Sequence, residues 1–131
     1  MANLSNIAND VRTDMCKAML DSIDASVDPG YVELHTAAEA ALLVTITFNA
    51  KAFADPADGV AAVDVDPVIS DTAVAGGNAA VAIFYNGDGV VRFKGTVTAT
   101  GGGGAITIAS VTIASGGTVT ITGGTITMPA S

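Results

Sequence analysis

The sequence has no tryptophan, one cysteine, one histidine and few aromatic side chains, and each shortage excludes a class of structure or chemistry. Aromatic residues make up 5% of the chain, which leaves little material for an aromatic ligand pocket. Cys16 has no second cysteine for a disulfide, and no CxxC or Cys/His spacing is present that would support a zinc site. We therefore expect a fold held by packing alone, with no metal and no cofactor.

Long apolar runs are also missing. No stretch approaches the roughly 18 to 20 apolar residues of a membrane span. The first 15 residues, MANLSNIANDVRTDM, are polar and acidic, whereas a secretory signal needs a basic start followed by an apolar run. These observations predict a protein that is made and kept soluble in a cytoplasm until it assembles, and that has no membrane partner.

Basic residues are scarce, with 5 against 13 acidic residues and a formal net charge of −8. Such a chain repels a phosphate backbone and offers no basic stripe, so nucleic acid is not expected as a partner. The charge is also unevenly distributed. Every acidic residue lies at or before Asp88, the last charge is Lys94, and the segment from Gly95 to Ser131 contains no charged side chain.

An amphipathic pattern marks the N-terminal region. Apolar residues recur there at helical intervals of three to five, which predicts a helix from about Ser5, its N-cap, to about Asp24. The members of this stripe are Leu4, Ile7, Val11, Met15, Ala18 and Ile23. Pro29-Gly30 cannot continue a helix, so residues 1–28 are assigned to it. Cys16 falls off the stripe and is expected to be a semi-buried hydrophobe without chemistry.

From residue 29 to residue 131 the pattern is that of β-strands. Alternating segments at residues 31–35 and 42–48 lead into an Ala-, Asp- and Pro-rich connection over residues 49–77. Residues 79–85 and 90–98 flank Asn86-Gly87-Asp88-Gly89 as a hairpin, and short strands separated by glycine turns follow. The prediction is one structural unit, mostly β: the helix followed by an antiparallel β-sandwich, jelly-roll-like or immunoglobulin-like.

Residues that could carry chemistry have simpler structural interpretations. His35 is alone and is expected at a sheet edge. The acidic series Asp55, Asp58, Asp64, Asp66 and Asp71 lacks the spacing of a calcium loop, as does Asn86-Gly87-Asp88-Gly89. The run Gly101 to Gly104 lacks the lysine and hydroxyl of a phosphate loop and is expected to be a linker or hairpin tip. No catalytic residue is assigned, and an enzyme is not expected.

Threonines form T-x-T rows in the uncharged C-terminal segment, and their spacing is too irregular for a solenoid. Edges without lysine or proline call for a partner. The candidate interface residues are Leu4, Ile7, Val11, Met15, Thr118, Thr120 and Thr122.

Several short motifs, in order, resemble a family of tailed-phage capsid decoration (cement) or head-associated virion proteins. They are an N-terminal helix with an N-x-x-x-x-D-like motif, a strand, an L-x-x-T-x-T-F-type strand, I-S-D-T, a strand ending in a D/N-G turn, G-T/S-V, and a Thr/Ser/Gly-rich end. Here they correspond to Asn6 to Val11, Tyr31 to His35, Leu43 to Phe48, Ile69 to Thr72, Ala79 to Gly89, Gly95 to Val97 and Ile106 to Met128. The chain departs from the family pattern in lacking the aromatic, often Trp, before the turn, where Val81 to Phe84 stands.

The resemblance implies a structural role. The expectation is a protein on the outer capsid surface of the virion that binds the major capsid protein, stabilises contacts between its subunits and self-associates, with a trimer as one option. The alternatives left open are another virion component, such as a tail, tail-tube or head-tail connector protein, and a receptor- or glycan-binding β-sandwich module.

Overall fold

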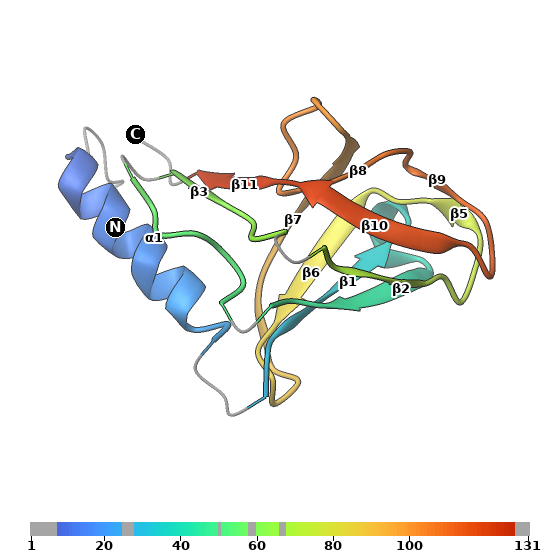
Figure 1. The fold of residues 1–131 in the computed structure, drawn as a ribbon, viewed down its shortest axis with the longest axis horizontal. Coiled ribbons are helices and arrows are strands. Elements are labelled where there is room, and N and C mark those ends of the chain that lie inside the picture. Colours follow the sequence, from blue (N-terminus) through green and yellow to red (C-terminus); the bar gives the residue numbers. More distant parts are fainter. Residues whose placement is uncertain (1–7, 25–27, 50, 58–59, 66–67, 128–131) are drawn as a thin grey trace.

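The computed structural model describes residues 8–24, 28–49, 51–57, 60–65 and 68–127. It is mostly β with one N-terminal α-helix, as the sequence predicts (Figure 1). The elements are α1 (Asn9–Asp21), β1 (Tyr31–His35), the 3-10 turn η1 (Ala37–Glu39), β2 (Leu42–Thr47), β3 (Val60–Ala62), β4 (Ser70–Thr72), β5 (Gly77–Asn78), β6 (Val81–Tyr85), β7 (Val91–Ala99), β8 (Ile106–Ile108), β9 (Thr112–Ile113), β10 (Thr118–Gly123) and β11 (Thr125–Thr127).

The helix turns a different face to the core from the one expected, except at Ile23. Ile23 is buried as expected, together with Cys16 and Leu20, whereas Ala18 is exposed and Val11 and Met15 are 47% and 38% exposed. Both sets have helical spacing, so periodicity alone allows either face, and the residues packed against the helix decide between them. The expected N-cap Ser5 lies outside the described residues, and Cys16 is fully buried where partial burial was expected.

Asp24 joins the end of the helix to the β-region. Its Oδ1 accepts a hydrogen bond from the Ala52 backbone N–H at 3.1 Å. Burial raises the pKa of the Asp24 carboxyl, and the bond from Ala52 acts in the opposite direction. A tertiary contact, together with the burial of Ile23, therefore anchors the chain where α1 stops.

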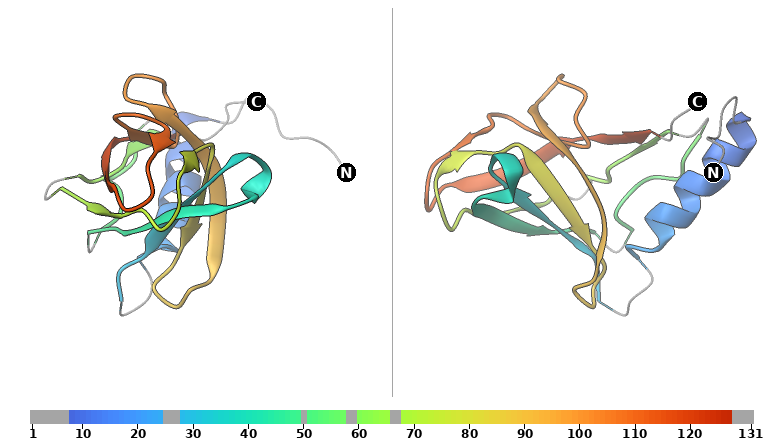
Figure 2. Two further views of the ribbon diagram at one scale, coloured as in Figure 1. Left: turned by 90° about the vertical axis from the view of Figure 1, so that its right-hand side faces the viewer. Right: turned by 180° about the vertical axis from the view of Figure 1, so that it is seen from behind.

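Seven strands form one strongly curled sheet in the order β2-β1-β6-β7-β8-β10-β4. Its two end strands approach each other, and the Val74 N–H donates to the Leu43 carbonyl at 2.8 Å across the seam. The sheet is therefore nearly closed. Figure 2 (left) looks along its interior with α1 behind, and Figure 1 shows α1 at one end of the long axis. Two-stranded pairs, β11-β3 and β5-β9, extend from this body.

One pairing departs from the all-antiparallel expectation, because β7 and β8 run parallel, with Val97 opposite Ile106. Neighbouring parallel strands usually need a crossover of a dozen or more residues. Here the chain returns within the short segment that contains the glycine run, where Gly101 and Gly103 adopt φ of +88° and +80°. The glycine run is thus a tight return loop and not a hairpin tip.

The predicted hairpin is confirmed as β6 and β7, which pair antiparallel. Asn86 organises its turn, because its Oδ1 accepts the N–H groups of Asp88 at 3.1 Å and Val90 at 3.0 Å. Gly89 supplies the positive φ of +82° that the turn requires. Asn86 and Gly89 therefore stabilise the turn in the way that their residue types predict.

A single cluster of buried residues joins the helix to the sheet interior. At the end facing α1, all four phenylalanines meet. Phe84 lies 4.5 Å from Phe93 and 5.9 Å from both Phe48 and Phe53 between ring centroids. Aliphatic side chains of the β-strands fill the rest of the interior. The phenylalanines of this chain are thus concentrated at one point of the core.

Candidate interaction surface

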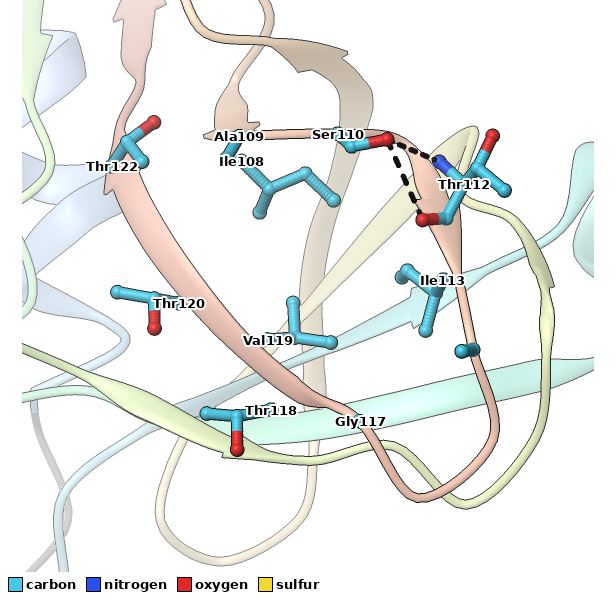
Figure 3. A pocket seen from close by; sticks show the side chains of 11 residues that line it. Ile108, Ala109, Ser110, Thr112, Ile113, Gly117, Thr118, Val119, Thr120 and Thr122 are labelled. Atoms are coloured by element: carbon cyan, nitrogen blue, oxygen red, sulfur yellow. Dashed lines mark hydrogen bonds between the residues drawn. The ribbon is translucent and has the colours of Figure 1, made fainter.

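A shallow groove of about 330 Å³ lies between β10 and the segment that carries β9, and we call it the C-terminal groove (Figure 3). Its lining contains no charged residue. The lining residues are Ile108, Ala109, Ser110, Thr112, Ile113, Ala114, Gly117, Thr118, Val119, Thr120 and Thr122. In Figure 3 the side chains of Ile108, Ile113 and Val119 face the groove, whereas Thr118 and Thr120 project from the other side of β10, so these threonines border the groove on an uncharged strand.

Alternation along β10 places these residues. Val119 and Ile121 are buried, so Thr118, Thr120 and Thr122 point to the other side of the strand. The opposite wall is held by the β5-β9 pair, where Thr112 Oγ1 donates to Asn78 Oδ1 at 3.0 Å. A strand with a regular period of two and a separately anchored arm thus produce the groove.

The three threonines are not equivalent. Thr122 Oγ1 is 3.1 Å from Thr107 Oγ1 and 2.7 Å from Thr100 Oγ1, so its hydroxyl is used inside the molecule. Thr107 is the buried polar member of this group. Within the part of the chain that the structure describes, the hydroxyls of Thr118 and Thr120 have no hydrogen-bond partner. These two hydroxyls can therefore bond to a partner at no loss of internal bonds.

The candidate residues on the helix lie elsewhere. Val11 and Met15 project from α1, and Figures 1 and 2 place α1 at the end of the molecule opposite the β9 arm. Leu4 and Ile7 lie outside the described residues. The seven candidates therefore do not form one surface: an apolar helix face occupies one end, and hydroxyl groups lie toward the other.

Sequence reasoning missed a polar cluster on the outer face of β1 and β6. Glu33 Oε1 accepts a hydrogen bond from Tyr85 Oη at 2.9 Å and lies 3.0 Å from His35 Nε2. The Tyr31 and Tyr85 rings stack with centroids 4.8 Å apart. The period of two in Tyr31, Glu33 and His35 was the available signal, because it places all three on one face.

The position of His35 differs from the expected one, since β1 lies between β2 and β6 and is not an edge strand. Its Nδ1 is buried and, among the described residues, has no hydrogen-bond partner. Burial, then the hydrogen bond to Glu33 and the charge of Glu33, raise the pKa of Tyr85 to about 12. A tyrosine with that pKa stays neutral near pH 7, so the cluster orders the sheet surface and supplies no ready nucleophile.

Other groups that could bind ions are dispersed. Asp55 pairs with Lys51, and Asp58 and Asp66 lie outside the described residues. Within the ranges given above, no three His, Cys, Asp or Glu side chains are grouped as a metal site. In those same ranges, no helix has the length and apolar character of a membrane span.

Comparison of this chain with protein-family models, with curated proteins and with solved structures finds no match.

Proposed function

We propose that this protein is a structural component of a tailed-phage virion that binds the outer surface of the capsid and reinforces contacts between major capsid subunits. The observation that carries the proposal is the uncharged C-terminal surface, where the groove lined by Ile108, Ile113 and Val119 lies beside the outward hydroxyls of Thr118 and Thr120 on β10 (Figure 3). The resemblance in the order of sequence motifs supports the same role.

The chemistry of the groove suits a permanent protein interface. Burying an ion without a partner is costly, whereas this surface exposes only small apolar groups, hydroxyls and backbone. The carboxylates lie in the chain up to Asp88, outside the segment that builds β8 to β11. An acidic body with one uncharged surface can therefore face solvent on most sides and a capsid on one.

The finer features of the proposal are a sandwich of the jelly-roll or immunoglobulin type and self-association, with a trimer as one option. The exposed helix residues Val11 and Met15 are the proposed contact between copies, since the groove lies toward the other end of the molecule.

The test is co-sedimentation with purified capsids that lack this protein. The wild type is expected to co-sediment, and the double variant Thr118→Lys, Thr120→Lys is expected to remain in the supernatant, because two buried charges would oppose docking. The matched control is Thr47→Lys on β2, which adds a charge at an exposed threonine outside the groove. Equal binding by all three proteins, or no binding by the wild type, contradicts the proposal.

A reconstruction of the native particle separates the alternatives. Density for this chain on the outer shell at junctions between capsid subunits supports decoration. Density confined to the tail, or rings and tubes formed by the isolated protein, supports a tail, tail-tube or connector component.

A further inference from the structure

A second opening lies between β7 and β11, and we call it the β7–β11 wedge. It has a volume of about 470 Å³. It is lined by β7 from Phe93 to Thr96, by β11, by Met19 of α1, and by Gly103 and Ala105.

The open edge of β7 follows from its ladders. This strand pairs with β6 over most of its length but with β8 only from Val97 to Ala99. The Val97 N–H donates to the Ala80 carbonyl at 3.1 Å, so alternate residues from Val97 back to Phe93 direct their backbone groups toward β6. The backbone groups of Lys94 and the N–H of Thr96 therefore face away from β6 and into the wedge. Among the described residues, no strand pairs with this part of the edge.

β11, on the other side of the wedge, also has backbone groups that are directed away from its partner strand. The Val63 N–H donates to the Gly124 carbonyl at 3.0 Å, and this bond fixes which residues of β11 direct their backbone groups toward β3. The backbone groups of Thr125 and Thr127 point the other way. The Thr125 N–H donates to the Gly104 carbonyl at 3.3 Å, next to the start of β8. The wedge therefore lies next to the N-terminal end of β8, where the glycine loop leaves the sheet.

The charge of β7 indicates which kind of strand can pair with its open edge. The outward side chains of β7 include Arg92 and Lys94, two of the five basic residues in a chain of net charge −8. Lys94 Nζ already bonds to both carboxylate oxygens of Glu39, so the exposed Arg92 sets the charge of this edge. An acidic segment complements Arg92, whereas two β7 edges paired in register at Arg92 would place like charges opposite each other, which is destabilising.

We infer that the β7–β11 wedge accepts an extended segment of a different polypeptide, carrying acidic side chains, as an added strand on the open edge of β7. The backbone of Lys94 and the Thr96 N–H supply the main-chain bonds, and Arg92 supplies the charge that favours acidic residues. The apolar side chains of Met19, Phe93 and Ile126 receive the alternate residues of the segment. Adding a strand to an exposed edge is a general mode of peptide recognition.

The experiment uses the full chain labelled with ¹⁵N and two synthetic peptides, one of four Thr-Glu repeats and one of four Thr-Lys repeats. We expect the Thr-Glu peptide to shift the amide resonances of Lys94 and Thr96 and to slow their hydrogen exchange. The Thr-Lys peptide is expected to bind about tenfold more weakly, which corresponds to about 1.4 kcal/mol from the opposed charges.

Two pairs of variants keep the test specific. Thr96→Pro removes the N–H that faces the wedge at a position where an edge strand tolerates proline, and Thr96→Ala keeps that N–H. Arg92→Glu is expected to reverse the preference between the two peptides, and Arg92→Gln is expected to reduce it. The two Arg92 variants do not contain the proline, so the test can still be completed if Thr96→Pro misfolds.

Three results would overturn the inference: no response of Lys94 and Thr96 to either peptide, protection of both amides in the free protein, or peptide preference unchanged in Arg92→Glu. Protection in the free protein would mean that another part of this chain already fills the wedge. No capsid enters this assay, so its outcome is independent of the co-sedimentation that tests the proposed function.

Discussion

At the scale of single residues, Phe84 is the position on which the core depends most. It is fully buried and its ring contacts the other three phenylalanines. We expect Phe84→Ala to lower the free energy of unfolding by about 3–5 kcal/mol, measured by urea denaturation, because the cavity forms where these rings meet. The control is Phe93→Ala, at the partly exposed rim of the cluster. A loss at Phe84 no larger than that at Phe93 would contradict this account.

Tyr85 gives a prediction for alkaline pH. Its pKa is raised from 10.0 to about 12, so the folded state favours the neutral phenol more than the unfolded state does. The resulting stabilisation is fully present below pH 10 and is lost as the pH rises toward 12. In a Tyr31→Phe background, Glu33→Gln is expected to lower the pKa of Tyr85, measured from the ultraviolet absorbance of the phenolate. An unchanged pKa would assign the whole shift to burial.

At the scale of elements, η1 contains backbone strain that a matched pair of substitutions can reveal. Ala38 and Glu39 have φ of 58° and 57°, whereas Ala40 has a right-handed φ of −68°. Both alanines are exposed. We expect Ala38→Gly to raise the free energy of unfolding by about 0.5–1 kcal/mol and Ala40→Gly to lower it by about the same amount. Thermal denaturation measures both, and equal signs would show that η1 is unstrained.

The strain in η1 is held by one tertiary contact and one local hydrogen bond. Lys94 Nζ donates to both carboxylate oxygens of Glu39 at 3.0 and 2.9 Å, and the Glu39 N–H donates to the Thr36 carbonyl at 2.9 Å. The Ala-rich segment around η1 carries no sequence signal for a left-handed backbone, because neither glycine nor asparagine stands there. This element could not have been predicted from composition.

At the scale of the whole molecule, the helix and the sheet are expected to unfold together. Cys16, Leu20 and Ile23 belong to the same buried cluster as the sheet interior. Burial raises the pKa of the Cys16 thiol, which also lowers its reactivity in the folded state. In increasing urea, reaction of Cys16 with a thiol reagent should begin at the same concentration as the change in tyrosine fluorescence from β1 and β6.

The control for this measurement is Leu20→Ala, which should shift both transitions to lower urea by the same amount, since a buried leucine contributes about 2–5 kcal/mol. Thiol reaction before the fluorescence change would show that α1 detaches from a folded sheet. In that case residues 1–28 and 29–131 would be separate units.

The sequence predicted the features that depend on neighbouring residues. The helix, the strands 31–35 and 42–47, and the β6–β7 hairpin with its Asn86 turn follow from local periodicity and turn chemistry. The exposure of the β10 threonines follows in the same way from a period of two. Local patterns also identified the uncharged C-terminal segment that builds the candidate groove.

Only the tertiary structure decided how these elements combine. The buried face of α1, the parallel pairing of β7 with β8 and the approach of β4 to β2 all depend on contacts between residues distant in the sequence. A period of two states which side chains share a face, but it does not state which strand lies beside which, because hydrogen bonds between strands are made by backbone groups common to all residues. The amino-acid pattern thus determined the elements and their faces, and packing and strand pairing determined the curled sheet, the groove and the wedge.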